Sequence, residues 1–373
     1  MKATPLVDVH RELGARLVDF GGWQMPVQYG SILEEGKIVR QACGLFDLSH
    51  MGRFHVTGPD AVRLVDRVCT NHAEKIPVQS IRYSLLCNEA GYPIDDLLIY
   101  REQEGVYLVV NAGNTERDLA WIREHGADLD AECHDLTDSQ AMLALQGPAS
   151  VEILQKLVEG YDLSQLKYYK FAFASVCGLH DVRISRTGYT GEDGFEIYFD
   201  PTEAKNVWDA LLEAGKPHGI APIGLGARDI LRLEAGMALY GHELDESSNP
   251  MEAGVDFALA FTEEKGDFIG RKALEKLKGE RTHRLVGITT EGPRVPRQGH
   301  PLIDPNDGDR VCGRVVSGGV SPTLKTNIGS AFVELGRDQA ETELALDMRG
   351  KHQACKVREL PFYSRTRKKK KST

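Results

Sequence analysis

Residues 83–111 read YSLLCNEAGYPIDDLLIYREQEGVYLVVN and contain three apolar segments of strand length. These segments are rich in Leu, Ile, Val and Tyr: 83–87, 94–100 and 106–111. The two intervening stretches, 88–91 and 102–105, each end in glycine, which favours a turn. Residues 83–111 therefore predict an antiparallel meander of three strands.

Strand and helix patterns flank this meander on both sides. A strand at 53–60 and a helix at 61–69 precede it, and a helix at 115–124 and an edge strand at 132–138 follow it. This order is typical of a small α+β layer with an antiparallel sheet. We expect a ferredoxin-like α+β domain over residues 51–138, inserted into a larger unit.

The segments around the insertion mix helices and strands. We predict helices at 10–17 and at 32–43, the second capped by Ser31 with Glu34 as its capping-box partner. After the insertion, further strands and helices are predicted at 141–148, 150–159, 182–186, 194–199, 201–214 and 227–236. We expect residues 1–50 and 139–278 to form one discontinuous α+β domain.

From residue 279 the pattern is all β. Strands separated by Gly, Pro and Asp turns are predicted at 285–289, 313–317, 328–333 and 343–348. We therefore expect a third domain over residues 279–373, which makes the chain an α+β multidomain protein.

Composition excludes several classes of function. A net charge of −10 over 373 residues argues against general nucleic-acid binding. The apolar stretches are far shorter than the ~18 residues of a membrane helix, and the N-terminus lacks the apolar segment of a secretory signal, so we expect a cytoplasmic protein. The basic run at 365–371 is interpreted either as a solvated end or as a steering surface for an acidic partner.

Common catalytic and cofactor motifs are missing from the sequence. The chain has no phosphate-binding P-loop, no dinucleotide-binding glycine motif, no nucleophile elbow and no HExxH zinc motif. The seven cysteines include no CxxC pair, so we expect reduced thiols and no metal site.

Asp95 and Asp96 begin an otherwise apolar strand. With a period of two they point to opposite faces, so at least one carboxylate enters packed surface, where burial raises its pKa. The alternative is that both side chains cap the preceding turn at 90–93. Periodicity does not choose between these interpretations.

Two further segments carry polar groups suited to a ligand. In 187–198 a glycine-rich loop leads into a strand on which Glu196 is suited to a heterocycle with adjacent N–H donors. The alternative is an ordinary hairpin with a solvated polar face. Arg228 and Arg232 share one helical face as a carboxylate clamp would, whereas an ion pair of Arg232 with Asp229 or Glu234 is the structural alternative.

At these residues the sequence resembles the T-protein family of the glycine cleavage system, the aminomethyltransferases. The resemblance covers nearly the whole chain and rests on an ordered series of blocks: TPL 4–6, FGGW 20–23, PVQY 26–29, FDLSHM 46–51, NEAG 88–91, IDDL 94–97, ALQGP 144–148, GYTGEDG 188–194 and RLEAG 232–236.

The resemblance implies a fold, a reaction and a set of site residues. Three domains would form a cloverleaf around a central folate pocket, with a C-terminal β-barrel. The enzyme would take the aminomethyl group from the lipoyl arm of H-protein, release ammonia and form 5,10-methylenetetrahydrofolate from tetrahydrofolate. Asp96 would be the catalytic carboxylate, Glu196 the pterin ligand and Arg228 a polar folate contact. Other pocket members would be Tyr83, Tyr100, Asn111, Tyr189 and Arg365.

Two rival functions share this resemblance. A folate-dependent demethylase, or the folate half of a flavin-linked enzyme, would use the same pocket, but the chain has no dinucleotide-binding domain of its own. A non-catalytic folate-binding protein is the other rival. Those relatives carry Lys-Gly-Cys-Tyr where this sequence has Lys-Gly-Asp-Phe at 265–268.

Overall fold

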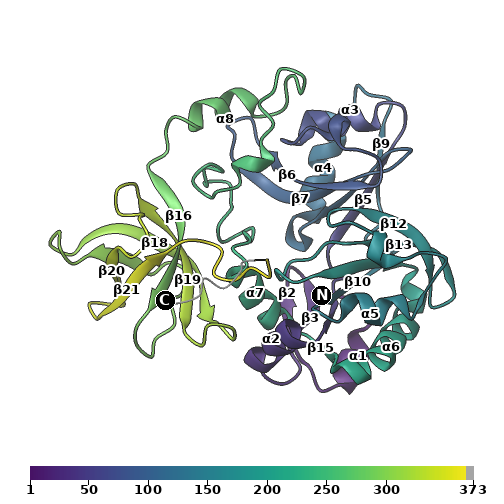
Figure 1. The fold of residues 1–373 in the computed structure, drawn as a ribbon. Coiled ribbons are helices and arrows are strands. Elements are labelled where there is room, and N and C mark those ends of the chain that lie inside the picture. Colours follow the sequence, from purple (N-terminus) through teal and green to yellow (C-terminus); the bar gives the residue numbers. More distant parts are fainter. Residues whose placement is uncertain (367–373) are drawn as a thin grey trace.

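The computed structural model describes residues 1–366, which form three lobes (Figure 1). Two lobes are built on open sheets and the third is a closed barrel. The expected α+β multidomain class with a C-terminal β-barrel is confirmed. None of the described helices is long and apolar enough to cross a membrane. Residues 367–371 of the basic run at 365–371 lie outside the described residues.

The first lobe contains a seven-stranded sheet in the order β11-β12-β13-β14-β10-β4-β15. All neighbouring strands are antiparallel except β15 and β4, which are parallel. Its strands are β4 (Gly44–Asp47), β10 (Ala141–Gln146), β11 (Val158–Glu159), β12 (Phe171–Val176), β13 (Leu179–Ser185), β14 (Gly194–Phe199) and β15 (Ala221–Pro222). Because β4 pairs directly with β10, with Asp47 opposite Leu143, the chain leaves this sheet and returns beside its point of departure.

Each face of this sheet buries a separate apolar cluster. One face packs against α1 (Val7–Glu12), α5 (Ser150–Gln155) and α6 (Ala204–Gly215), and its cluster includes the fully buried Trp208. The other face packs against α2 (Ile32–Gln41) and α7 (Leu225–Glu234), and against the sheet of the second lobe. The seven-stranded sheet is therefore covered on both sides.

The N-terminal segment differs from its predicted helix at 10–17. Helix α1 ends at Glu12, and β2 (Arg16–Phe20) pairs with β3 (Trp23–Gln28), beside β1 (Lys2–Ala3). Gly14 explains the break, because its φ of +73° is left-handed and cannot continue a helix. Helix α2 is confirmed, but Ser31 makes no capping bond. The carboxylate of Glu35 instead accepts the backbone N–H groups of nearby residues: Tyr29, Gly30 and Gly224.

The second lobe is a five-stranded antiparallel sheet in the order β6-β7-β8-β5-β9. Its strands are β5 (Gly52–Thr57), β6 (Ser80–Cys87), β7 (Pro93–Arg101), β8 (Val106–Val110) and β9 (Glu132–Asp135). Helices α3 (Ala61–Val68) and α4 (Thr115–His125) pack on one face. The predicted meander is confirmed as β6, β7 and β8, with Gly91 in the first turn at a φ of +82°.

The third lobe is a closed barrel in the order β16-β19-β18-β17-β20-β21. Its strands are β16 (His283–Thr290), β17 (Pro301–Asp304), β18 (Arg310–Val320), β19 (Asn327–Glu334), β20 (Glu343–Asp347) and β21 (His352–Arg358). The four predicted strands correspond to β16, β18, β19 and β20. Strands β17 and β21 were not predicted, because short segments broken by Asp and Lys have little strand signal.

A long connection joins α7 to the barrel and includes α8 (Arg271–Leu277). Its apolar residues between Leu244 and Leu274 pack onto Leu85 and Cys87 of β6, so this stretch covers an edge of the second lobe. The proposed domain bounds, 1–50 with 139–278, 51–138 and 279–373, stay a prediction. Short 3₁₀ turns complete the described chain: η1 (Ala73–Lys75), η2 (Ala112–Asn114), η3 (Leu163–Gln165), η4 (Pro201–Glu203), η5 (Lys216–His218) and η6 (Asp256–Ala258).

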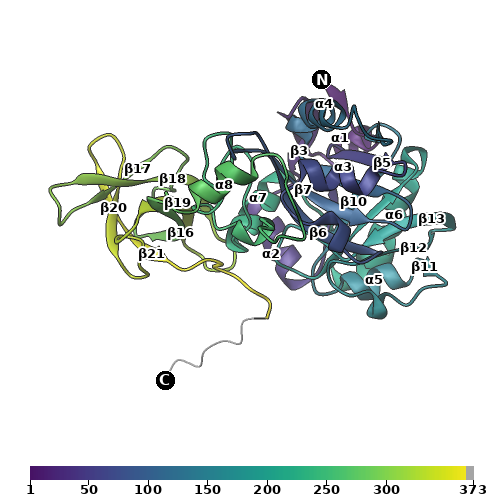
Figure 2. The ribbon, with the colours of Figure 1, turned by 90° about the horizontal axis from the view of Figure 1, so that it is seen from above.

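Helix α7 lies between the barrel and the two sheet lobes in both views (Figures 1 and 2). Its buried Arg232 donates to Glu243 at 2.8 Å and to the barrel hydroxyl of Ser317 at 2.7 Å. The carboxylate of Glu234, also buried, accepts from Arg40 of α2 at 2.7 Å and from the hydroxyl of Thr323 at 2.8 Å. The buried charges of Arg232 and Glu234 on α7 thus stabilise the packing of the barrel against the first lobe.

We expect Glu234→Gln to lower the free energy of unfolding by about 3 kcal/mol, because it leaves the buried guanidinium of Arg40 with one carboxylate partner, Glu192, instead of two. Urea denaturation measures this loss. Glu213→Gln is the matched control, since Glu213 forms an exposed pair with Lys216 and its loss should cost under about 1 kcal/mol. Equal costs for both variants would contradict the role given to the buried pair.

Candidate active site

Asp95 and Asp96 stand near the start of β7 and point to opposite faces of the sheet. Neither side chain caps the preceding turn. That turn is closed by Asn88, whose side-chain oxygen accepts the backbone N–H of Tyr92 at 3.1 Å. The turn-capping interpretation of the two aspartates is therefore wrong.

The carboxylate of Asp96 is held by two donors. Tyr83 on the neighbouring strand β6 donates its hydroxyl to Oδ2 at 3.0 Å, and the side-chain amide of Asn111 donates to Oδ1 at 2.8 Å. Burial, and after it the charge of Asp95, raises the pKa of Asp96 from its ordinary 3.8 to about 7, although both hydrogen bonds oppose this shift. Asp96 can therefore take up or release a proton near neutral pH.

Glu196 lies on β14 of the first lobe and is buried with 5% of its surface exposed. Three hydroxyls donate to its Oε2: Thr187 at 2.5 Å, Tyr198 at 3.3 Å and Tyr100 at 3.4 Å. No described residue donates to Oε1. Burial raises the pKa of Glu196. The alternative of an ordinary hairpin with a solvated face is wrong. The face of β14 that carries Glu196 is buried, and Tyr100 of the second lobe contacts it.

Arg228 and Arg232 of α7 have different environments. The guanidinium of Arg232 is fully engaged by Asp229, Glu243 and Ser317, so a clamp made by both arginines is wrong. Arg228 receives no hydrogen-bond acceptor from the described residues and lies over the ring of Tyr189 at 4.7 Å. Burial lowers the pKa of Arg228, and the charge of Glu196 opposes that shift. A guanidinium of this kind can bind a polar ligand atom.

Tyr189 lies within electrostatic range of both Asp96 and Arg228. Its hydroxyl donates to the carbonyl of Ala238, and burial raises its pKa while Asp96 and Arg228 both act on it electrostatically. Arg228 in turn lies near Glu196. Strands β6, β7 and β14, helix α7 and two loops thus bring the predicted site residues into one neighbourhood. These residues are Asp96, Tyr83, Asn111, Tyr189, Arg228, Glu196 and Tyr100.

Arg365 lies at the margin of this neighbourhood. Its guanidinium is 3.0 Å from Asp193 and 5.4 Å from the ring centre of Tyr168. The charges of Arg365 and Glu196 both act on Tyr168, whose pKa is raised by burial. Arg365 therefore reaches the loop that leads into β14, from the far end of the described chain.

Several polar groups around the site had no role in the sequence-based prediction. Thr187 and Tyr198 both bind Glu196, and Asn114 binds Asp95 at 2.5 Å. His50 is buried with its Nδ1 unpartnered among the described residues, and burial lowers its pKa to about 3. A run of hydroxyl residues beside a strand acid could have indicated Thr187, but no local pattern indicates Asn114.

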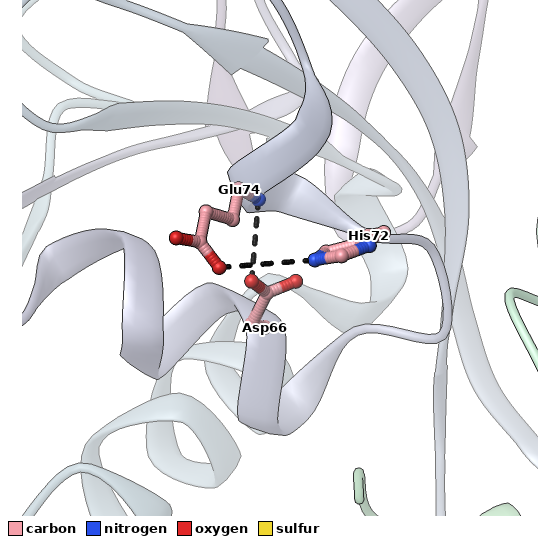
Figure 3. A group of neighbouring side chains, drawn as sticks. All are labelled: Asp66, His72 and Glu74. Atoms are coloured by element: carbon pink, nitrogen blue, oxygen red, sulfur yellow. Dashed lines mark hydrogen bonds and ion pairs between the residues drawn. The ribbon is translucent and has the colours of Figure 1, made fainter. Parts of the chain in front are cut away.

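A separate group of possible metal ligands lies on the second lobe: Asp66, His72 and Glu74 (Figure 3). Their ligand atoms lie within 4.8 Å of one another. The ammonium of Lys265, however, is 2.7 Å from Asp66 Oδ1 and already supplies a cation there. Asp66 also accepts the backbone N–H groups of Ala73 and Glu74, so its oxygens are committed within the protein.

Comparisons with known proteins show which proteins this chain is similar to. Residues 6–263 match the family described as the GCVT N-terminal domain, and residues 283–364 match the glycine cleavage T-protein C-terminal barrel domain. An aminomethyltransferase of Symbiobacterium thermophilum is 49% identical over 370 residues, covering 97% of each chain. One of Chloroherpeton thalassium is 44% identical and covers 98% of this chain and 100% of its own. The crystal structure of glycine cleavage system aminomethyltransferase T from Bartonella henselae superposes with a TM-score of 0.89 at 32% identity, covering 97% of this chain and 98% of that one.

We expect Asp96→Asn to stabilise the folded protein at pH 8 by roughly 2–4 kcal/mol. The folded-state pKa of about 7 exceeds the ordinary 3.8, so the native state binds the proton more tightly and loses stability as the pH rises between these values. The gain should therefore grow from pH 4 to 7 and stay level above. Urea denaturation at several pH values measures it, with the exposed Asp138→Asn as control. A gain independent of pH would contradict the shifted pKa.

Proposed function

This chain belongs to the glycine cleavage T-protein family of aminomethyltransferases, and on that basis we propose the full reaction it performs. The chain transfers the one-carbon unit from the aminomethyl-lipoyl arm of H-protein to tetrahydrofolate. The products are 5,10-methylenetetrahydrofolate, ammonia and dihydrolipoyl H-protein. Lipoylated H-protein is its protein partner and tetrahydrofolate is its one-carbon acceptor.

Asp96 is the catalytic residue in this proposal, and its position carries the argument. Asp96 as a whole residue is half-buried, and two side chains fix the orientation of its carboxylate. Its pKa of about 7 leaves the carboxylate largely ionised just above neutral pH. In that form it positions and polarises the pterin nitrogens as one of them attacks the aminomethyl carbon. A covalent protein nucleophile is not required.

The unpaired polar atoms of the first lobe suit a reduced pterin. Glu196 Oε1 is a carboxylate oxygen without a donor among the described residues, which fits the adjacent N–H groups of a heterocycle. Arg228 supplies a guanidinium without an acceptor, and Tyr189 supplies a ring beneath it. We assign Tyr83, Tyr100, Asn111 and Arg365 to the same folate-binding site.

The cytoplasm is the proposed location. All seven cysteines are free and six of them are buried, as expected where thiols stay reduced. No membrane or nucleic-acid partner is proposed.

The decisive assay supplies aminomethylated H-protein and tetrahydrofolate and measures released ammonia. Ammonia release that depends on both substrates supports the transferase. Demethylation of another donor without H-protein, or folate binding without turnover, would replace the proposal by the demethylase or by the non-catalytic binder.

We expect Asp96→Asn to lower turnover at least about hundredfold while tetrahydrofolate still binds, because the lost carboxylate acts on the transition state. In the unmodified enzyme kcat should rise with pH through a midpoint near the pKa of about 7 and then level off, as Asp96 loses its proton. Stopped assays across pH 5.5–9 measure both effects. Unchanged turnover in the variant would remove Asp96 from the mechanism.

We expect Glu196→Ala to weaken tetrahydrofolate binding by about 1–3 kcal/mol, since pterin N–H donors would lose their acceptor. Isothermal titration calorimetry measures the change. The control is Glu159→Ala, which removes an exposed carboxylate from β11 of the same sheet. If both variants bind like the parent, Glu196 serves only the fold.

A further inference from the structure

Asp118 is a carboxyl group that the proposed reaction leaves unexplained. It stands in the first turn of α4 with none of its surface exposed. Neither of its oxygens has a hydrogen-bond donor among the described residues. A buried carboxylate without a donor is costly, so this group needs either a partner or a proton.

The neighbour of Asp118 is Asp95, because Asn114, one helical turn before Asp118, donates to Asp95 Oδ1 at 2.5 Å. A side-chain hydrogen bond to Asp95 is also among the causes that raise the pKa of Asp118. Asp95 is also fully buried, but it is well supplied with donors. Its Oδ1 accepts the side-chain amides of Asn111 at 2.8 Å and Asn114 at 2.5 Å, and its Oδ2 accepts the backbone N–H of Asn111 at 3.0 Å. These three bonds identify Asp95 as the ionised member of the pair.

A carboxylate offers about four acceptor positions, and three of those on Asp95 are filled. The position that remains is on Oδ2, which accepts one bond only. A protonated Asp118 has one O–H group to donate. The O–H group of a protonated Asp118 would therefore fill the open acceptor position on Asp95 Oδ2 and would give Asp118 its hydrogen-bond partner.

Electrostatics place the proton on Asp118. Burial, followed by repulsion from Asp95, raises the pKa of Asp118 to about 11. The other charged or titratable groups near it are Arg117 on its own helix, Asp96 on β7 and Cys69 at the end of α3. The N-terminus of α4 favours an anion, but repulsion between adjacent buried carboxylates is the larger effect.

The pair is connected to the catalytic residue through one side chain. The Nδ2 amide of Asn111 donates both to Asp95 Oδ1 and to Asp96 Oδ1, each at 2.8 Å. Any displacement of Asp95 would therefore move the donor that orients Asp96.

We propose that Asp118 is a permanently protonated carboxylic acid that donates a hydrogen bond to Asp95 and so positions Asn111 and the catalytic carboxylate of Asp96. Asp118 is a positioning residue and touches no substrate. Its kinetic consequence rests on the proposed function of Asp96, whereas its protonation state does not.

Infrared difference spectroscopy tests the proton directly. At pH 9 Asp96 is ionised, so the full-length protein minus Asp118→Asn should show the C=O stretch of one protonated carboxyl group. The control Glu116→Gln removes an exposed acid from the same helix and should leave that band in place. Absence of a protonated-carboxyl band in the Asp118→Asn difference would overturn the proposal. Since the spectrum needs no substrate, this result is independent of the proposed reaction.

Kinetics test the positioning role. Asp118→Asn keeps a neutral donor, so kcat should stay within about twofold and the midpoint of its pH profile should not move. Asp118→Ala removes the donor and should lower kcat about ten- to hundredfold with little change in KM. The midpoint of the pH profile of kcat should also shift in this variant. A midpoint lowered by a full unit in Asp118→Asn would mean that a negative charge had been removed and would refute the protonated state. An equal loss of kcat in both variants, with no shift in the midpoint of the pH profile, would show that Asp118 serves packing alone.

Discussion

Buried ionic contacts of α7 hold the lobes of the molecule in their relative positions. Arg232 and Glu234, two residues apart, are each satisfied by partners from other parts of the fold: the first by Glu243 and Ser317, the second by Arg40 and Thr323. Because a buried charge is stable only with its partners in place, these contacts fix the barrel against the first lobe. The same helix presents Arg228 one turn earlier, so the orientation of α7 also sets the orientation of the candidate binding site.

The two sheets meet through tyrosines, and this packing creates the site. Tyr100 and Tyr107 of the second lobe pack edge-on against Tyr198 of the first, and the hydroxyls of Tyr100 and Tyr198 are 2.8 Å apart. Tyrosine suits this junction because its ring fills apolar space while its hydroxyl satisfies a buried acid. Glu196 is therefore held by a side chain from the opposite lobe. Burial also disfavours the ionised form of the acids in this region. It is the main reason why the pKa values of Asp96 and Asp118 are raised.

Much of the fold could be predicted from the sequence because its signals are local. The meander at 83–111, helix α2 and four of the six barrel strands, β16, β18, β19 and β20, follow from apolar periodicity and turn glycines. The helix predicted at 10–17 was wrong because Gly14 adopts a left-handed conformation and the following residues pair with β3, a partner that periodicity does not reveal. The capping role of Ser31 was wrong for a similar reason: Glu35 satisfies the backbone there and also binds Gly224, almost 190 positions away.

Local patterns in the sequence are sufficient to predict the alternation of strands and helices and the apolar setting of Asp95 and Asp96. Its ordered blocks are sufficient for the resemblance to the glycine cleavage T-proteins. Which groups share a site depends on the packing of the lobes. Tyr83 and Asn111 reach Asp96 across neighbouring strands, Arg228 is left without a hydrogen-bond acceptor among the described residues while Arg232 is neutralised, and Asp118 is set against Asp95. Hydrogen bonding and desolvation depend on distance in space, and residues far apart in the chain acquire that distance only when the lobes pack together.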